Sequence, residues 1–214
     1  MKYHKLVENA KKPNGFWGKM MIKAMNKGHS SLTSWGLEHM NIERTATVLD
    51  IGCGGGKTVD RLCSIVANGK VYGIDYSELS VKTSEKLNSK NILCNKAKIL
   101  QTSVSDMPFD DNTFDNITAV ETYYFWPDKE NDVKEVFRVL KQGGTVMLLF
   151  EMLRTDDDPF KWEKVENMLN IKSVTPQEIR AVLESAGFEN INTYTKEGTT
   201  WLCATAQKPK DDEN

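Results

Sequence analysis

The run from Val48 to Gly56, Val-Leu-Asp-Ile-Gly-Cys-Gly-Gly-Gly, constrains the fold of this chain more than any other stretch. Apolar residues around one acid predict a buried strand, and the glycines after them predict a tight turn at its end. A helix-like stretch from Lys57 to Ala67 follows. Because glycine has no Cβ, the backbone can pass close to a ligand, and the first helical amides can meet an anion. The pattern predicts a nucleotide-type cofactor at the carboxyl end of a central parallel strand.

The glycine spacing separates the classes of cofactor. A dinucleotide fingerprint that starts at Gly52 needs a third glycine at position 57, which is lysine here. A Walker-type phosphate loop that ends at Gly56-Lys57-Thr58 needs its first glycine at position 51, which is isoleucine. A cofactor with both an amino group and a carboxylate fits better, because Asp50 can face the cation while backbone amides face the anion.

This segment resembles motif I of the class I S-adenosylmethionine (SAM) methyltransferases, and more narrowly their small-molecule branch, which includes quinone methyltransferases of the type 11 kind. In that family the glycine-rich turn holds the methionine end of SAM. The resemblance implies cofactor contacts from Asp50, Gly52, Cys53 and Gly54. A glycine-rich turn that only packs a helix against a strand is the structural alternative.

A second acid follows at the expected distance. Lys70–Asp75 reads as a short apolar strand that ends in Asp75, roughly 20 residues past the glycines, where an acid meets ribose hydroxyls in dinucleotide folds. The family uses this position for the SAM ribose, with Tyr76 beside the adenine. As an alternative, Asp75 could cap the helix that opens at Ser77.

The adenine segment matches the family in part. The chain keeps the frame Met107-Pro108-Phe109 and later Phe114-Asp115, but Ser103 stands where the family often has an acid. The Ser103 hydroxyl can still accept a bond from the adenine amino group, more weakly than a carboxylate would. Val104 could offer its backbone amide to the ring. We expect Asp115 to fix this loop without touching the cofactor.

Further blocks appear in the family's order, and the agreement covers about residues 46–151. It implies an α/β, Rossmann-like, doubly wound and mostly parallel seven-stranded sheet with one antiparallel strand. We expect a single methyltransferase domain over 1–214, divided into an N-terminal helical lid segment, a cofactor-binding core, and C-terminal helices with a β-hairpin (1–40, 46–151 and 152–207). Within it we expect strands at 114–120 and 145–150, a helix from Pro127 that reaches Leu140 and ends at 141–144, a capped helix from Thr175, and a hairpin of 188–194 with 200–206.

The first forty residues carry a basic, amphipathic helix pattern. Its apolar residues recur at helical spacing, and its lysines lie on another face (Phe16, Trp17, Met20, Met21, Ala24 and Met25; Lys19, Lys23 and Lys27). We favour packing of this helix on the catalytic domain. A lid over the acceptor site and a surface helix on anionic lipid are the alternatives.

Two segments are candidates for the acceptor side. Glu121 could orient the methionine end of SAM or take a proton from the acceptor, and Tyr123, Tyr124 and Trp126 could hold a planar or cationic acceptor, although we expect at least two of these aromatics to be core. His29 is a candidate general base because its reference pKa is nearest neutrality. His4 and His39 are weaker candidates for the general base.

Composition narrows the partners of the 214-residue chain. A net charge of −2 gives no global attraction to nucleic acid, and Asn-Pro-Pro-Tyr and Pro-Cys motifs of DNA methyltransferases are absent. The four cysteines are scattered, so we expect reduced thiols in the cytoplasm, with no disulfide or zinc site. No apolar run reaches the roughly 18 residues of a membrane span, so we expect no stable membrane insertion. The spacing predicts no metal site, and the protein is expected to be a monomer or homodimer.

The sequence thus predicts a SAM-dependent methyltransferase that acts on an unidentified small molecule and releases S-adenosylhomocysteine. A SAM-binding sensor or partner subunit without transferase activity is the first alternative. An NAD-dependent oxidoreductase is less favoured, because lysine occupies the third glycine position.

Overall fold

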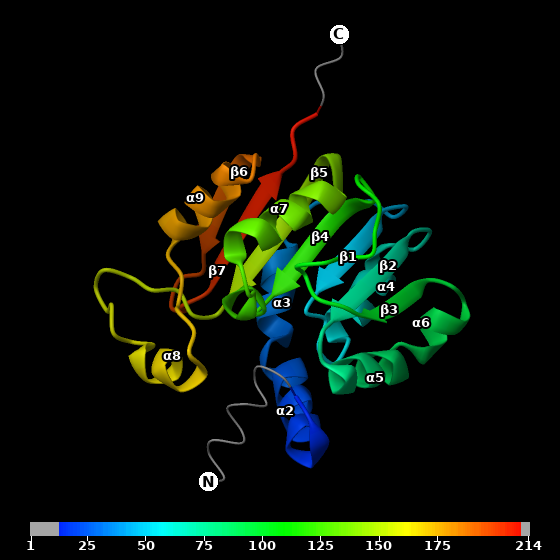
Figure 1. The fold of residues 1–214 in the computed structure, drawn as a ribbon, viewed down its shortest axis with the longest axis horizontal. Coiled ribbons are helices and arrows are strands. Elements are labelled where there is room, and N and C mark those ends of the chain that lie inside the picture. Colours follow the sequence, from blue (N-terminus) through cyan, green and yellow to red (C-terminus); the bar gives the residue numbers. More distant parts are fainter. Residues whose placement is uncertain (1–12, 211–214) are drawn as a thin grey trace.

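A computed structural model describes residues 13–210, without the side chains at positions 24, 26 and 27. It shows one seven-stranded sheet flanked by helices (Figure 1). The strands are β1 (Thr47–Ile51), β2 (Lys70–Asp75), β3 (Ala97–Gln101), β4 (Phe114–Val120), β5 (Leu140–Phe150), β6 (Glu189–Thr195) and β7 (Leu202–Gln207). The helices are α2 (Gly15–Gly28), α3 (Ser30–Leu37), α4 (Lys57–Ile65), α5 (Glu78–Leu87), α6 (Ser89–Leu93), α7 (Lys129–Val139), α8 (Glu163–Leu169) and α9 (Pro176–Ser185), with a 3-10 turn η1 (Tyr123–Phe125).

The strand order is β3-β2-β1-β4-β5-β7-β6. The pairs from β3 to β5 are parallel, and β7 runs antiparallel to both β5 and β6. The predicted mostly parallel sheet with one antiparallel strand is therefore confirmed. The order reverses between β1 and β4, which places a crevice beyond the carboxyl ends of these two strands.

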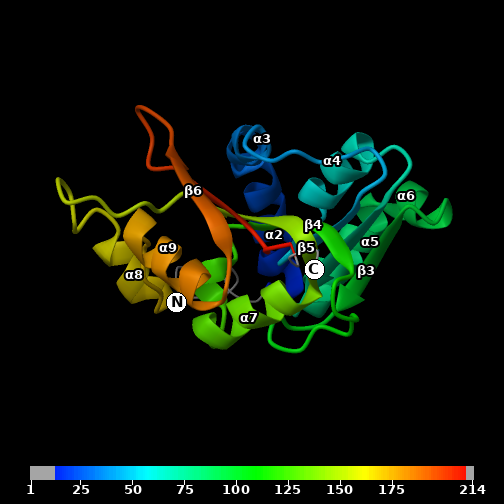
Figure 2. The same cartoon turned by 90° about the horizontal axis from the view of Figure 1, so that it is seen from above.

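Helices cover both faces of the sheet, α3 and α4 on one and α7 and α9 on the other (Figure 2). The parallel strands are buried on both sides, so Val48 and Leu49 of β1 both have no exposed surface although they point to opposite faces. Their side chains enter different apolar clusters, Leu49 the one against α7 and α9 and Val48 the one against α4. None of the described helices is long and apolar enough to cross a membrane.

The junction of α7 and β5 differs from the prediction. The helix ends at Val139, and Leu140 is already the first residue of the strand, where it pairs with Phe114. Leu140 is fully buried. The glycines predicted to end the helix instead lie inside β5, where Gly143 adopts a φ of 73° and the register slips before Asn116 pairs with Thr145. Tertiary pairing of Leu140 thus shortens the helix by one residue and turns its expected cap into a β-bulge.

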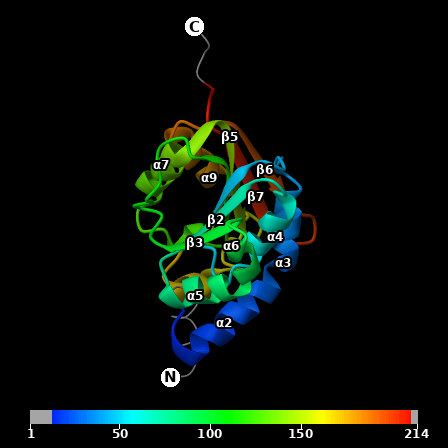
Figure 3. The ribbon, with the colours of Figure 1, turned by 90° about the vertical axis from the view of Figure 1, so that its right-hand side faces the viewer.

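Helix α2 projects beyond the carboxyl side of the sheet (Figures 1 and 3). It contacts α3 and α5, and its Ile22 is buried at 2% exposure. The predicted packing stripe is wrong in part, because Phe16, Trp17 and Met20 are exposed. The periodicity identified the helix, but it could not say which side would meet the domain.

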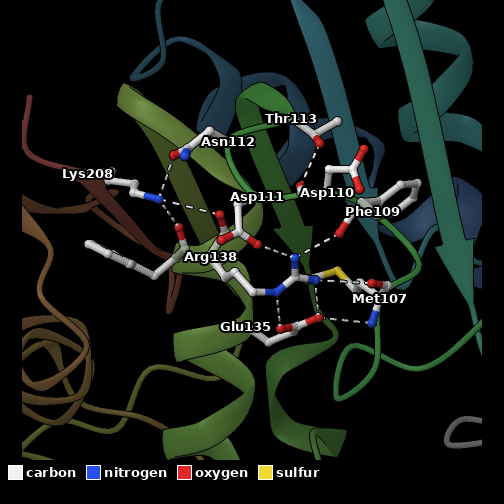
Figure 4. A network of polar contacts seen from close by, with 10 residues as sticks. Met107, Phe109, Asp110, Asp111, Asn112, Thr113, Glu135, Arg138 and Lys208 are labelled. Atoms are coloured by element: carbon white, nitrogen blue, oxygen red, sulfur yellow. Dashed lines mark hydrogen bonds and ion pairs between the residues drawn. The ribbon is translucent and has the colours of Figure 1, made fainter.

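The loop between β3 and β4 is tied to α7 by Arg138 (Figure 4). This guanidinium donates to the carbonyl oxygens of Phe109 and Met107 at 2.8 and 3.2 Å. It also pairs with Glu135, whose carboxylate accepts from the amide of Met107 at 3.0 Å. A charge-assisted network of this kind fixes the far end of the loop predicted to carry the adenine contacts.

Candidate functional site

Two adjoining cavities lie beyond the carboxyl ends of β1, β2 and β4. Counted with the space that is open to solvent, their empty volumes are about 930 and 830 Å³, and the two are named the larger and the smaller cavity by this measure alone. The larger one reaches α2 and α4, and the smaller one reaches the loop after β3. Five residues line both cavities and form the boundary between them: Gly52, Asp75, Tyr76, Thr122 and Phe125. One elongated ligand can therefore occupy both.

The glycine turn after β1 lines the larger cavity, and its first residue, Gly52, lines both cavities. Gly52 has a φ of 68°, and a Cβ there would lie 2.2 Å from Oγ1 of Thr122. Gly54 has a φ of 50°, but a Cβ there would meet only the Gly52 carbonyl oxygen at 3.9 Å. The first glycine is thus required by packing against the protein, and the second leaves space open to a ligand.

Asp75, predicted to bind a ribose, lies at the junction of the two cavities. Its side chain is buried, with Oδ2 accepting from the amide of Gly54 at 3.0 Å and Oδ1 from the amide of Ser77 at 2.8 Å. Burial raises the pKa of the Asp75 carboxyl, and the two amides oppose that rise. The residue that caps α5 is Ser77, whose hydroxyl accepts from the Ser80 amide, so the cap alternative for Asp75 is wrong. Asp75 instead holds Ser77 and the glycine turn while it lines both cavities.

Asp50 and Cys53 line the larger cavity from the strand side. Asp50 is 2% exposed, and one carboxylate oxygen accepts from the Thr118 hydroxyl at 2.8 Å. Burial raises the pKa of Asp50 to about 7. The Cys53 thiol lies 3.9 Å from the Ser84 hydroxyl, and burial raises its pKa. A cationic ligand group would stabilise the ionised form of Asp50.

The smaller cavity brings together Tyr76, Ser103 and Val104, the three residues predicted to surround an adenine. The Ser103 hydroxyl accepts from the amide of Ser105 at 3.2 Å. Trp126 was expected on the acceptor side, but it lines this cavity. Its ring nitrogen is buried and has no hydrogen-bond partner among residues 13–210.

Glu121 follows β4 in a left-handed conformation, with a φ of 55°. Its Oε1 accepts from the amide of Glu151 and from the hydroxyl of Tyr124, the latter at 3.2 Å. The same hydroxyl accepts from the amide of Met152 at 3.0 Å. Burial raises the pKa of Glu121 to about 8, with the nearby Glu151 carboxylate contributing. The network fixes Glu121 in the wall of the larger cavity.

The two tyrosines after Glu121 do not line either cavity. Tyr123 is buried in the core, 5.7 Å from Phe150 and 5.2 Å from Trp126 between ring centroids. The predicted acceptor contact from Tyr123 is therefore corrected to a packing role, because its ring completes the apolar layer under η1. Tyr124 is also buried, and it acts on the cavity through Glu121.

His29 lies between α2 and α3 and lines the larger cavity together with Ile22 and Met25 of α2. Its Nε2 is 3.8 Å from Oε2 of Glu151, and burial lowers its pKa. His39 instead stacks on Tyr194 with centroids 4.0 Å apart, which is a structural position. His4 lies outside the described residues.

The fold brings His29, Glu121 and Glu151 together, each with one donor atom within 4.8 Å of the others. Sequence analysis missed Glu151 and predicted no metal site, because the three residues lie in segments far apart in the chain. The available signal was an acid directly after a predicted buried strand, the same signal that Asp75 and Glu121 gave.

Comparison with known proteins agrees with this geometry. The methyltransferase domain family matches residues 49–148. The ubiquinone/menaquinone biosynthesis C-methyltransferase UbiE of Cronobacter sakazakii is 30% identical over 73% of this chain and 72% of its own length. The chain belongs to the SAM-dependent methyltransferases. An uncharacterized Bacillus subtilis methyltransferase, YdaC, is 27% identical over 85% of this chain and 93% of its own.

Solved structures show the same fold. A chain from the complex between the Haloferax volcanii Trm112 methyltransferase activator and a methyltransferase superposes with a TM-score of 0.76, at 19% identity over 90% of this chain and 95% of that one. Methyltransferases of this family use SAM as methyl donor. The cavities fit that cofactor, because the space beside Gly54 is open and the carboxylates of Asp50 and Asp75 face it from two strands.

Proposed function

We propose that this methyltransferase binds SAM across both cavities and transfers its methyl group to a small-molecule acceptor in the larger one. The observation that carries the proposal is the position of Asp75, a buried carboxylate that lines both cavities and holds the glycine turn. A carboxylate there can accept both vicinal hydroxyl protons of a ribose.

The cofactor residues have distinct roles in this proposal. Asp50 and the backbone of Gly52, Cys53 and Gly54 surround the methionine end in the larger cavity. Tyr76, Ser103 and Val104 surround the adenine in the smaller one.

The acceptor side is formed by Glu121 and His29, with Tyr124 as a positioning residue for Glu121. SAM supplies a methyl group that is already activated on a sulfonium. The protein has to align the acceptor with that methyl group and exclude water, and alignment alone can account for roughly 7–11 kcal/mol of a barrier. A general base is needed where the acceptor must lose a proton, and it typically increases the reaction rate by about 10²–10⁴-fold.

The larger cavity closes against α2, which supports the lid role for the N-terminal segment. Ile22, Met25 and His29 line the cavity from this side, and the Pro13 carbonyl oxygen accepts from the Ser77 hydroxyl at 2.9 Å. The segment before the core thus reaches the start of α5, next to Asp75. We include 1–40 as part of one domain with the core at 46–151 and the region at 152–207.

The cysteines and the net charge support a proposal for the protein's location and for its class of acceptor. The four cysteines are free, which is typical of proteins in a reducing cytoplasm. The net charge of −2 favours a small-molecule acceptor over nucleic acid, with the protein acting as a monomer or homodimer.

Calorimetric titration with S-adenosylhomocysteine, with NADH as control, tests the cofactor. Micromolar binding of the first and no binding of the second is expected, and binding of NADH alone would overturn the proposal. Acceptors are then screened with radiolabelled methyl, starting with demethylated quinones because of the UbiE relative. Tight cofactor binding without transfer to any acceptor would favour the alternative, a SAM-binding sensor or partner subunit.

A further inference from the structure

We propose that His29, Glu121 and Glu151 bind one divalent transition-metal cation in the wall of the larger cavity. The three side chains come from the α2–α3 junction, the end of β4 and the end of β5. Their donor atoms, one imidazole nitrogen and two carboxylate oxygens, all lie within 4.8 Å of one another. Small side-chain rotations bring such atoms to metal–ligand distances of about 2.0–2.2 Å.

The local charge balance favours a cation at this place. The ligand atoms of Glu121 and Glu151 lie within 4.8 Å of each other, close enough for the two carboxylates to repel when both are ionised. Among the side chains that the structure describes, the ion pair found for Glu151 is with His29, and neither carboxylate pairs with a lysine or arginine. Two carboxylates beside a largely buried imidazole are stabilised by a bound divalent ion, which binds all three without adding a proton.

The surroundings of Glu121 are those of a fixed ligand. Both of its hydrogen bonds, from Tyr124 and from the Glu151 amide, end on Oε1. They leave Oε2 as the oxygen that can bind a metal, and they hold the carboxylate in one orientation. Such supporting hydrogen bonds orient metal-binding carboxylates in proteins generally.

The donor set decides the class of ion. An imidazole nitrogen with two carboxylates suits Zn²⁺, Mn²⁺ or Fe²⁺ better than Mg²⁺ or Ca²⁺, which prefer oxygen ligands alone. Three protein ligands also leave coordination positions open toward the cavity. An acceptor with an oxygen donor could occupy such a position beside the methionine end of the cofactor. That role rests on the proposed function, whereas metal binding itself does not.

The test titrates metal-free, EDTA-treated full-length protein with MnCl₂ and with ZnCl₂ by calorimetry, in the absence of SAM and of any acceptor. One ion per chain is expected for the wild type. His29→Ala and Glu151→Gln each remove one ligand and should weaken binding by about tenfold or more. Their side chains are 24% and 47% exposed, so both variants are expected to fold, which circular dichroism checks.

Glu85→Gln is the matched control, because Glu85 is an exposed acid on α5 away from the cluster, and it should bind the ion like the wild type. No saturable binding by the wild type would overturn the proposal, and so would equal affinity in His29→Ala and Glu151→Gln. Because the titration contains no cofactor, its result is independent of whether methyl transfer is found. Methyl transfer without metal binding would leave these residues as acceptor contacts and remove the metal site.

Discussion

The backbone amide of Gly54 donates a 3.0 Å hydrogen bond to Oδ2 of Asp75, which joins the glycine turn after β1 to the end of β2. The two motifs that identify the cofactor class are therefore one structural unit. Any change that removes the Asp75 carboxylate acts on the proposed ribose contact and on the turn at the same time.

Asp75→Ala is expected to weaken binding of S-adenosylhomocysteine by about 10–100-fold, since a hydrogen bond to a charged group contributes about 1.5–3 kcal/mol. The Gly54 and Ser77 amides also lose their acceptor, so the turn loosens. Calorimetric titration measures the loss, with Glu85→Gln as the control. Unchanged affinity in a folded Asp75→Ala protein would remove the ribose assignment.

Gly52→Ala and Gly54→Ala should separate folding from binding. A Cβ at Gly52 would lie 2.2 Å from the Thr122 hydroxyl, so that variant is expected to lose several kcal/mol of stability, as strained and overpacked sites do. At Gly54 a Cβ meets open space, so the variant should fold with only the cost of its positive φ, about 1 kcal/mol. Because Gly54 lines the larger cavity, its Cβ would nevertheless occupy space at the proposed site of the methionine end of the cofactor. Chemical denaturation and S-adenosylhomocysteine titration of both variants test this; a Gly54→Ala protein that binds like the wild type would contradict it.

The strand ends explain how much of the site the sequence could predict. Asp50 and Asp75 lie near the carboxyl ends of the paired parallel strands β1 and β2, and such ends meet at one edge, so the local pattern was enough to bring them together. Glu151 directly follows the buried strand β5, but no motif surrounds it. Its partnership with His29 depends on how α2 and α3 pack, which hydrophobic spacing does not encode.

The aromatic residues after β4 also show what the sequence could not predict, which is the direction in which each side chain points. Tyr123, Tyr124 and Trp126 lie within four residues, yet Tyr123 packs in the core, Tyr124 orients Glu121 and Trp126 lines the smaller cavity. The direction of each side chain is set by the 3-10 turn η1, which the sequence pattern did not predict. Leu140 likewise belongs to a strand because it pairs with Phe114. That pairing could not be predicted from local pattern, because Phe114 lies far away in the sequence.

The buried carboxyl of Asp50 should make stability depend on pH. Its pKa is about 7 in the folded protein against 3.8 for the free side chain. Between these values the folded state holds a proton that the unfolded chain has released, so the free energy of unfolding falls as pH rises. The slope from this group is at most about 1.4 kcal/mol per pH unit. Urea denaturation at pH 5, 6 and 7 should show a smaller decline for Asp50→Asn than for the wild type and for Glu85→Gln; parallel declines would contradict the burial effect.

Tyr124→Phe should lower turnover more than cofactor affinity. The variant removes the hydroxyl that donates to Glu121 and accepts from the Met152 amide. A buried amide without its partner costs about 1–3 kcal/mol of stability. Glu121 then loses one of the two bonds that orient it, whereas the residues around Asp75 are untouched. Affinity for S-adenosylhomocysteine is expected to stay within about twofold, well under the tenfold that 1.4 kcal/mol represents, while methyl transfer to an identified acceptor falls.

Glu121→Gln is the second variant in this test, since glutamine keeps the shape of the glutamate side chain and removes its charge. Equal turnover in wild type and both variants would make the loop after β4 structural.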